Sequence, residues 1–339
     1  MQIIFRTDAS THIGTGHVMR CLVLAESLKE LGAEVAFICR KLPGNLTSKI
    51  SANNFPVYLV EEDHHASETL TIIQSFTKVD CMIVDHYDID LDWEEKVKPF
   101  AGKLMVIDDL ANRPHDCDIL LDQNHVANKE KRYDHLIPKE AVRLFGVKYL
   151  LLRKEFREVK VDAKHSQRIK RILISFGGSD PTNETMKALQ AVASFPYLKI
   201  DVMIGEANPY SGEILSFCHD KKFVAIHQQT KDVAILMAEA DIAIGAGGTT
   251  TWERIYMLLP SLTIETAANQ ADILAHLADE GLVYHLGKSD HVTANHIKEK
   301  LLLLIKHPDF LLTMRKKAEA FRQQIDPLAV ARLIMEGGS

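Results

Sequence analysis

The fold is decided by residues 3–39, which read IIFRTDASTHIGTGHVMRCLVLAESLKELGAEVAFIC. The apolar run at 3–6 has the length of a buried strand, and a turn with two glycines leads from it into a segment with the apolar period of a helix. This segment ends near Gly32, and a second apolar run follows at 35–39. A strand, a helix and a second strand in this order are typical of an α/β protein with a parallel sheet.

Short apolar runs and longer amphipathic segments keep alternating along the 339 residues, a length at which chains usually divide into two domains. A charged stretch at 156–171 interrupts the alternation, which then starts again and becomes helical only after about residue 290. The sequence therefore predicts two doubly wound, Rossmann-like domains, 1–157 and 168–339, with ligands at the carboxyl ends of the strands in a cleft between them. The predicted strands are 3–6, 35–39, 57–60, 81–84, 104–107, 118–121, 171–176, 200–205, 223–227, 241–245, 262–265 and 282–287.

The composition excludes several classes of protein. Hydrophobic residues make up 46% and charged residues 25% of the chain, as in ordinary globular proteins. The formal net charge of -6 gives no long-range attraction to nucleic acids or anionic lipids, and no window approaches the roughly 18 apolar residues of a membrane span. Five widely spaced cysteines suit reduced thiols, and the first residues do not resemble a secretory signal. We therefore expect a cytoplasmic monomer that binds neither nucleic acid nor membrane.

The first glycine turn carries the first candidate site. Gly14 and Gly16 would let a ligand approach the backbone, and His17 follows in the first turn of the helix. The positive end of the helix dipole favours a neutral imidazole, which a general base requires. A histidine bonded to a loop carbonyl is an equal alternative. A dinucleotide site is excluded, because Met19 replaces its third glycine and Arg40 replaces its acid.

Charged residues around this turn are further candidates for substrate binding. Arg6 and Arg20 could bring positive charge to a diphosphate or a sugar, and Asp8 could hydrogen-bond hydroxyl groups. Arg20 equally suits a salt bridge at the surface. Asp8 lies at a strand end, which favours a position facing the ligand.

A second polar group, Asp85-His86-Tyr87, ends the predicted strand at 81–84. Asp85 could set the tautomer of a histidine, and Tyr87 could orient a water or a sugar hydroxyl. The alternative is turn chemistry, in which aspartates cap the next helix. Asp108 and Asp109 follow the strand at 104–107 in the same way and could line the same edge.

Two D-x-D triplets, at 88–90 and 116–118, match a pattern that holds divalent metals. Such triplets also arise by chance. The first reads better as a helix cap and the second as the approach to a strand. We therefore predict no metal site.

Two glycine turns of the second domain suit a diphosphate. Gly177, Gly178 and Ser179 follow the strand at 171–176, and their backbone N–H groups are not needed for a helix cap. The stronger signal is GAGGTTTWE at 245–253, where a glycine turn leads into a helix. Open N–H groups, hydroxyl donors and the positive end of the helix dipole meet there. The diphosphate-binding residues predicted in this turn are Gly247, Gly248, Thr249 and Thr250.

Three polar residues after this turn have two interpretations each. Glu253 could complete a capping box with Thr250, or accept both hydroxyls of a ribose. Asn269 and Gln270 open the next predicted helix, where Asn is a common cap. Gln270 is the weaker cap and therefore the better candidate for ligand binding.

Five blocks in this order, FRTDASTHIGTGHVMRCLVLA, IVDHY, ISFGGSDPTN, GAGGTTTWE and ANQ, resemble the PseG family of UDP-sugar hydrolases, which is related to the MurG-type GT-B glycosyltransferases. The resemblance covers residues 1 to about 290. It implies a GT-B fold and the cleavage of UDP-2,4-diacetamido-2,4,6-trideoxy-β-L-altropyranose by water, with inversion and without metal or other cofactor, in pseudaminic acid biosynthesis. Spore-coat polysaccharide proteins share the blocks, so another UDP-sugar is an open alternative.

The resemblance also assigns roles to residues. His17 matches the family's base, and Tyr87 matches its supporting partner. The region 247–253, together with Asn269 and Gln270, matches the part that binds uridine diphosphate, with Glu253 at the ribose. A GT-B glycosyltransferase with a UDP-sugar donor and a non-catalytic UDP-sugar-binding protein remain the alternatives.

Overall fold

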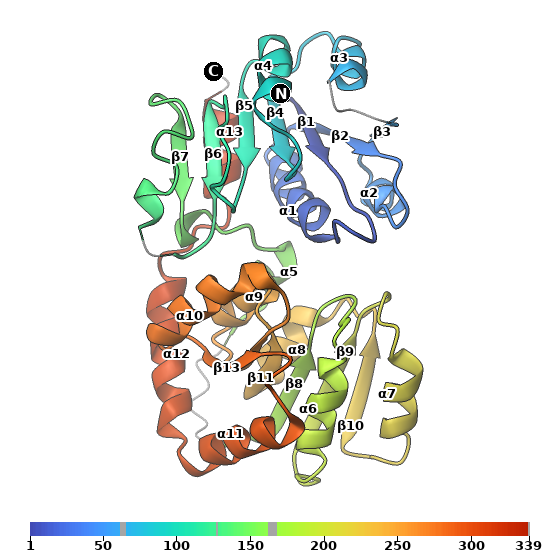
Figure 1. Ribbon diagram of the computed structural model, residues 1–339, viewed down its shortest axis with the longest axis vertical. Helices are drawn as coiled ribbons and strands as arrows, with labels where there is room; N and C mark the ends of the chain where they lie inside the picture. The colour runs from blue at the N-terminus through green and yellow to red at the C-terminus, as the bar shows by residue number, and fades with distance from the viewer. Residues whose placement is uncertain (62–65, 127, 162–167, 338–339) are drawn as a thin grey trace. The chain divides into compact units, whose positions relative to one another are not determined.

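A computed structural model describes residues 1–61, 66–126, 128–161 and 168–337. The chain forms two compact units, each built around one parallel sheet (Figure 1). The first unit contains Met1–Lys154 and Ile325–Ser339, and the second contains Glu155–Gln324. Residues 162–167 of the charged stretch at 156–171, where we expect the division between the domains, lie outside the described residues.

The first unit has a seven-stranded parallel sheet in the order β3-β2-β1-β4-β5-β6-β7. Its strands are β1 Gln2–Thr7, β2 Glu34–Arg40, β3 Val57–Val60, β4 Cys81–Asp85, β5 Leu104–Ile107, β6 Ile119–Asp122 and β7 Val142–Phe145. Its α-helices are α1 Gly16–Glu30, α2 Thr47–Ala52, α3 Ser67–Ile73, α4 Leu91–Val97 and α13 Ala329–Glu336, and its 3-10 helices are η1 Lys98–Phe100, η2 Lys129–Lys131 and η3 Val147–Tyr149.

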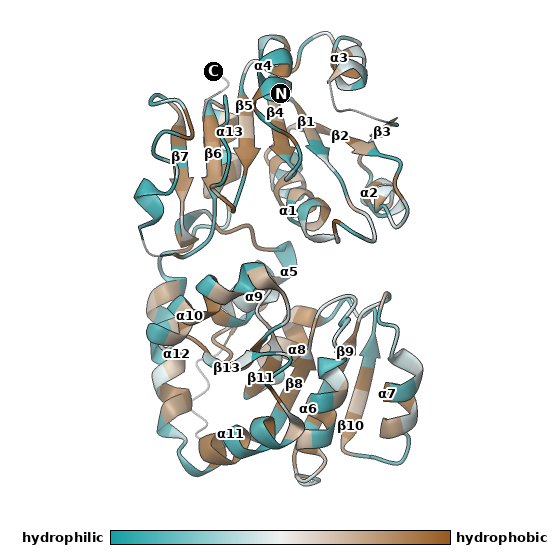
Figure 2. Cartoon of the chain, in the orientation of Figure 1, coloured by the Kyte–Doolittle hydropathy of each residue, from teal (hydrophilic) through white to brown (hydrophobic). Residues whose placement is uncertain are grey.

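Both faces of this sheet are apolar, which explains the unbroken apolar runs of its strands. Successive side chains of a strand point to opposite faces, so Ile3 and Phe5 pack into one core cluster and Ile4 into another. Figure 2 shows the central strands of both units as mostly hydrophobic and the helices around them as mixed. The predicted α/β class follows from this burial.

The second unit has a six-stranded parallel sheet in the order β10-β9-β8-β11-β12-β13. Its strands are β8 Arg171–Ser175, β9 Lys199–Ile204, β10 Val224–Gln228, β11 Ile242–Ala246, β12 Ser261–Glu265 and β13 Tyr284–Lys288. Its helices are α5 Lys154–Glu158 at the junction of the units, α6 Glu184–Val192, α7 Ser211–Cys218, α8 Val233–Glu239, α9 Thr250–Tyr256, η4 Ala268–Gln270, α10 Ala271–Asp279, α11 Ala294–Lys306 and α12 Asp309–Arg322.

Every predicted strand is present, and in the part of the chain that the structure describes one further strand was missed. β7 is the short edge strand Val142–Phe145, in which Val142 is exposed and Arg143 is half-buried. An edge strand of four residues with a charge inside it has no continuous apolar run, so the pattern used for the other strands does not detect it.

The last helix does not belong to the domain in which we expected it, which was the second domain at 168–339. α13 belongs to the first unit, and Val330, Ala331 and Ile334 are buried in the core cluster that contains Ile3. In Figure 1 this red helix lies among the blue and green elements of the first unit. The hydrophobic side of α13 needs an apolar surface to cover it, and α1 provides one.

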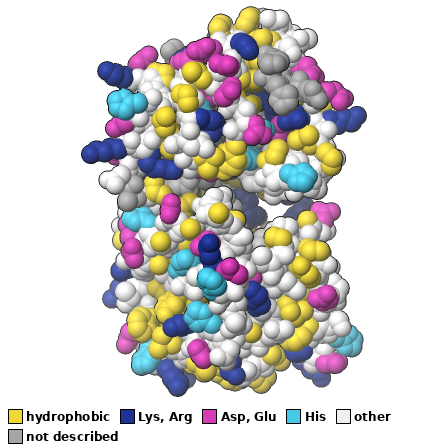
Figure 3. All heavy atoms as spheres, in the orientation of Figure 1, with side chains coloured by type: hydrophobic (Ala, Val, Ile, Leu, Met, Phe, Trp, Pro, Cys, Tyr) yellow, Lys and Arg dark blue, Asp and Glu magenta, His cyan; other side chains and the backbone are white. Residues whose placement is uncertain are grey.

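Charges are mixed on the surface. Acidic and basic side chains are interspersed on the face drawn in Figure 3. Among the described residues, none of the helices combines the length and the apolar character needed to cross a lipid bilayer.

Candidate active site

Strand order brings the first group of candidate residues together. β1 and β4 are neighbours although two strands separate them in the chain, so their carboxyl ends form the point where the strand order reverses. Thr7 and Asp85 are partners in the register at this edge. Because α1 starts from the loop after β1, its first residues lie at the same edge.

His17 and Asp85 form a close pair at this edge. His17 Nδ1 lies 2.6 Å from Asp85 Oδ1. Asp85 is ionised, so the short contact requires the hydrogen on Nδ1, and Nε2 then keeps a free electron pair. Within the part of the chain that the structure describes, no group hydrogen-bonds Nε2, and the side chain keeps 6% exposure. This arrangement suits a base that accepts a proton at Nε2.

Arg20 binds the same carboxylate from one turn further along α1. Its Nε donates to Asp85 Oδ2 at 2.5 Å and its Nη2 to Oδ1 at 2.7 Å. Its Nη1 donates to Asp109 Oδ2 at 2.8 Å. Arg20 is buried, with 9% exposure, so the alternative of a surface salt bridge is wrong.

Tyr87 and Asp109 close a ring of contacts around His17. The Tyr87 hydroxyl donates to Asp109 Oδ1 at 2.8 Å. The Tyr87 ring meets the His17 ring edge to face, with centroids 4.4 Å apart. We name these five residues, His17, Asp85, Arg20, Asp109 and Tyr87, the His17 circuit.

The charges of the circuit determine which of its groups can move a proton. Burial alone would raise the pKa of Asp85, but Arg20 and His17 outweigh it and hold the pKa well below its usual value. Burial and the Asp109 carboxylate raise the pKa of the Tyr87 phenol, so this hydroxyl is a donor at neutral pH. His17 is therefore the group in the circuit with an available basic atom.

Arg6 and Asp8 were expected to face a ligand, but their side chains are only 2% and 0% exposed. Arg6 Nη1 donates to Asp8 Oδ1 at 2.7 Å, and the backbone N–H of Arg40 donates to the same oxygen. The ring of His86 lies 3.0 Å from the other oxygen of Asp8. These residues brace the ends of β1, β2 and β4, because a buried charge needs partners of this kind.

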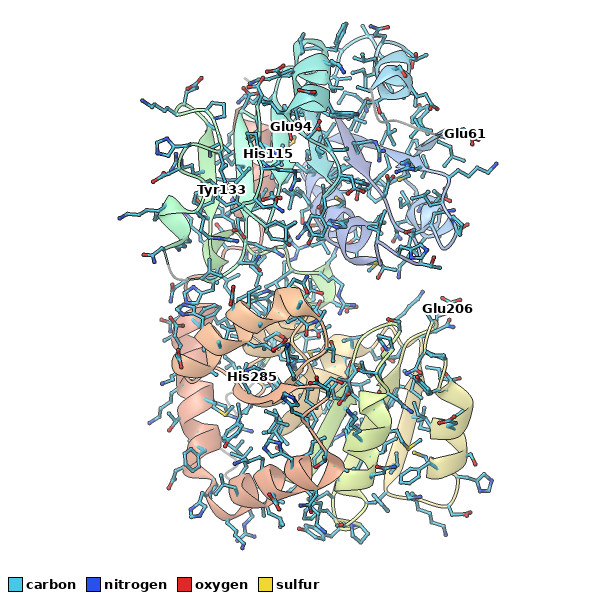
Figure 4. All side chains as sticks on the ribbon, in the orientation of Figure 1. Glu61, Glu94, His115, Tyr133, Glu206 and His285 are labelled. Atoms are coloured by element: carbon cyan, nitrogen blue, oxygen red, sulfur yellow. The ribbon has the colours of Figure 1, made fainter. Side chains whose placement is uncertain are left out.

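The loop that carries Asp109 is held by a second buried cluster. His115 Nδ1 lies 2.7 Å from Glu94 Oε1, and both side chains are fully buried. The Tyr133 hydroxyl donates to the carbonyl oxygen of Asp108 at 2.9 Å. Figure 4 labels Glu94, His115 and Tyr133 in the first unit, on α4 and on the loops before β6 and β7. Next to Tyr133, Arg132 Nη2 donates to the carbonyl oxygen of Asp109 at 3.0 Å, so the backbone of Asp108 and Asp109 is held by hydrogen bonds.

The two glycines of the first loop, Gly14 and Gly16, both have open space around them, but only Gly14 has a backbone conformation that favours glycine. Gly14 has φ +81°, a conformation that favours glycine, and its N–H donates to Ser10 O at 2.9 Å. A Cβ at Gly14 or Gly16 would meet nothing within 4 Å. The α1 N-cap, Thr15, makes no side-chain cap bond. The backbone before His17 is therefore open.

In the second unit, the point of strand reversal lies between β8 and β11. Gly177 and Gly178 follow β8, and a Cβ on either would meet nothing within 4 Å. Ser179 comes next and is exposed. Asp180 accepts the N–H groups of Glu184 and Thr185 at the start of α6.

The glycine turn after β11 wraps around a buried arginine. Arg254 is 1% exposed, and its Nη2 donates to Ala246 O at 2.7 Å and to Thr251 Oγ1 at 2.9 Å. A Cβ at Gly245 would collide with this guanidinium and with the Ser175 carbonyl. Burial lowers the pKa of Arg254 to about 10, and the nearby Glu253 opposes this shift. Arg254 therefore remains a cation directly behind the turn.

The outer part of this turn is more open. Gly248 is half-buried and would tolerate a Cβ without contact within 4 Å, and Thr249 is exposed. Thr250 is half-buried. By contrast, a Cβ at Gly247 would collide with Leu274. Residues 248–250 are therefore the more accessible part of the turn.

The remaining candidates of the second unit separate into buried and exposed residues. α9 starts at Thr250 with Thr249 as its N-cap, so Thr250 is not the cap that a capping box with Glu253 requires. Glu253 is 9% exposed. Gln270 Oε1 accepts the N–H of Thr266 at 2.9 Å and holds its own loop. Asn269 is exposed and is not a helix cap.

Arg254 was not among the predicted site residues, and Asp109 was predicted only to line the edge formed by the strand ends. Asp109 follows β5, the neighbour of β4, so the position of the Asp108-Asp109 pair at the end of a predicted strand was the available signal. Arg254 lies inside a helix beside apolar residues, and nothing in its sequence context distinguishes it from a surface arginine.

Comparisons with known proteins agree with this architecture. No model of a protein family matches the chain. The chain is 30% identical over 284 residues to the UDP-2,4-diacetamido-2,4,6-trideoxy-beta-L-altropyranose hydrolase of Campylobacter jejuni, which covers 83% of this chain and 97% of that one. The chain belongs to this hydrolase family.

Two other relatives are similar to this chain. An uncharacterized protein of Methanocaldococcus jannaschii is 26% identical over 319 residues, which are 91% of this chain and 63% of that one. The spore coat polysaccharide biosynthesis protein SpsG of Bacillus subtilis is 31% identical over 150 residues, or 43% of this chain and 44% of that one.

Solved structures place this member of the hydrolase family in the GT-B fold. MurG of Acinetobacter baumannii has a TM-score of 0.67 at 14% identity and covers 99% of both chains. The UGT71G1 protein of Medicago truncatula, solved with UDP-glucose, has a TM-score of 0.67 at 13% identity and covers 100% of this chain and 98% of that one. These likenesses confirm the predicted fold class of two parallel-sheet domains.

Proposed function

We propose that this chain hydrolyses a UDP-sugar and that His17 is the general base. A water molecule attacks the anomeric carbon, its proton passes to His17 Nε2, and the bond from that carbon to the diphosphate oxygen breaks with inversion. The free sugar and UDP leave. The observation that supports this step is the pairing of His17 Nδ1 with Asp85, which leaves Nε2 as the basic atom.

The second unit supplies the groups that we propose for UDP. The peptide N–H groups of Gly248, Thr249 and Thr250, backed by the Arg254 cation, suit the negative charge of a diphosphate. Gly177 and Gly178 offer open backbone at the neighbouring strand end. UDP is a good leaving group once the negative charge on its diphosphate is stabilised. The mechanism that we propose therefore uses neither a strong general acid nor a metal.

The substrate that we propose is UDP-2,4-diacetamido-2,4,6-trideoxy-β-L-altropyranose, in pseudaminic acid biosynthesis. The support for this choice is the 30% identity to a hydrolase that carries this sugar nucleotide in its name. Within the proposal, Glu253 and Asn269 bind the uridine part, as the family resemblance implies.

A glycosyltransferase is the second candidate, and the solved structures favour it. Several of the fold relatives, including a spinosyn rhamnosyltransferase with a TM-score of 0.67, are glycosyltransferases. In that case His17 would deprotonate an acceptor hydroxyl in place of water. Release of UDP without any acceptor separates the two functions.

The test is turnover of the UDP-diacetamido sugar in ¹⁸O-labelled water, with analysis of both products. Label in the free sugar supports attack at the anomeric carbon, and label in UDP contradicts it. His17→Asn should lower kcat by a factor of about 100 to 10,000. His12→Asn, an exposed histidine of the same loop, is the matched control and should keep full activity. Normal turnover of a folded His17→Asn protein would overturn the assignment.

A further inference from the structure

The His17 circuit contains two residues, Arg20 and Asp109, that the proposed reaction does not use directly. Arg20 binds both oxygens of Asp85 and one oxygen of Asp109. Asp109 in turn binds Tyr87, whose ring touches His17. Arg20 therefore connects to His17 by two routes, one through Asp85 and one through Asp109 and Tyr87.

We propose that Arg20 and Asp109 are positioning residues that set the charge and the orientation of His17. This inference rests on the proposed role of His17 as base. An aspartate beside a histidine favours the protonated ring, which cannot accept a proton. Arg20 neutralises most of this effect because its guanidinium binds the same carboxylate and its Nη2 lies 3.2 Å from His17 Nδ1. Asp85 can then fix the tautomer of His17 without favouring the protonated ring, which could not act as a base.

The balance of charge depends on all the titratable groups that face His17. With a neutral imidazole, the circuit holds the carboxylates of Asp85 and Asp109 and the guanidinium of Arg20. Cys21 Sγ lies 3.5 Å from Asp85 Oδ2, but burial and Asp85 raise the pKa of this thiol well above its usual value, so it stays uncharged. The Tyr87 phenol is also uncharged at neutral pH. The circuit thus carries a small net negative charge.

Asp109 has a second function, which is geometric. Its two oxygens hold Arg20 and Tyr87 at the same time, both at 2.8 Å. The Tyr87 ring then blocks rotation of the His17 ring from one side, while Asp85 holds Nδ1 from the other. These two contacts fix the orientation of the His17 ring and so the direction in which Nε2 points. Proton transfer requires that Nε2 point toward the proton that it accepts.

The test is the dependence of kcat/KM on pH in three variants. Arg20→Met removes the compensating charge, so its acid limb should move to higher pH by about one unit or more. Asp109→Asn removes a negative charge, so its acid limb should move to lower pH, and kcat should fall because Tyr87 is released. Arg20→Lys keeps the charge but cannot bridge both carboxylates, so its acid limb should stay in place while kcat falls.

Opposite shifts in Arg20→Met and Asp109→Asn support the proposal. Equal losses at every pH, with unshifted limbs, would show a purely structural role and overturn it. If Arg20→Met does not fold, Asp109→Asn and Arg20→Lys still decide the question. Arg143→Lys, which changes an Arg–Asp pair of the first unit away from the circuit, is the control. A His17→Asn protein with normal turnover would instead refute the proposed function, so the two failures are distinguishable.

Discussion

The Tyr87 hydroxyl donates to Asp109 Oδ1 over 2.8 Å, and the ring of Tyr87 contacts His17 edge to face. A tyrosine held in this way supports the histidine and does not replace it as the base, because burial and Asp109 raise the pKa of its phenol. The first prediction tests this distinction.

Tyr87→Phe keeps the ring against His17 and removes only the hydrogen bond to Asp109. We expect kcat to fall by less than the roughly 100-fold minimum for loss of a general base. Unfolding in urea should show a loss of about 0.5–1.5 kcal/mol, the usual contribution of one hydrogen bond. A loss of activity as large as that of His17→Asn would show that the phenol takes part in proton transfer.

Asp85→Asn should preserve the shape of the site and disturb the tautomer of His17. An equivalent change in a serine protease triad lowers kcat by about 10,000-fold, and we expect a loss of about that order here. The pKa of Asp85 is lowered in the folded state, so its contribution to stability is present above its unfolded pKa of about 3.9 and is lost as pH falls through the folded value. The stability difference between wild type and variant should therefore shrink below about pH 4.

Asp122 should make stability depend on pH in the opposite direction. Burial raises its pKa to about 6, although Arg132 opposes the shift. A raised carboxyl pKa means that the stabilising protonated state is complete below the unfolded pKa of about 3.9 and is lost as pH rises through about 6. Asp122→Asn should become more stable relative to wild type across this window, as measured by urea unfolding. Asp134→Asn, at an exposed aspartate of the same unit, is the control for the substitution itself.

The glycine turn of the second unit contains a matched pair of sites. Gly245→Ala should lower the melting temperature, because its Cβ would collide with the Ser175 carbonyl and Arg254, an overpacking that typically costs 1–3 kcal/mol. Gly248→Ala should fold normally, since its Cβ meets nothing within 4 Å. We expect Gly248→Ala to weaken UDP binding by about tenfold or more in calorimetry, equal to about 1.4 kcal/mol. Unchanged UDP affinity would contradict the proposed diphosphate site.

α13 should stabilise the first unit in proportion to its buried surface. Ile334→Ala removes a side chain that is 2% exposed, and we expect a loss of about 2–5 kcal/mol in the free energy of unfolding. Arg332→Ala, on the exposed side of the same helix, should change stability by less than about 1 kcal/mol. Equal effects of the two substitutions would contradict the packing of this helix.

Twelve strands of the described residues were predictable from their apolar runs, which are longest and most completely buried in the central strands β1, β4, β5 and β11. β7 was not predictable, because Val142 is exposed and Arg143 interrupts the run. The position of α13 was also missed, since an amphipathic pattern shows that a helix packs but not which sheet it covers.

The part of the candidate site that lies at the carboxyl ends of predicted strands could be predicted from the sequence. His17 and Asp85 were both expected at carboxyl ends, and the order of β1 and β4 makes those ends neighbours. The partners of Arg20 were beyond sequence reasoning, because they lie 65 and 89 residues further along the chain. Arg6 and Asp8 looked like ligand-binding residues because a position at a strand end does not show whether a charged side chain is buried.

The return of α13 to the first unit means that the last-synthesised part of the chain completes the core of its first part. Val330, Ala331 and Ile334 complete the same core cluster as Ile3, yet the ribosome makes them after every residue of the second unit. The second unit can therefore finish folding while the first still exposes the surface of α1 that α13 will cover. The residues around His17 belong to the unit whose core is complete only when α13 has been made.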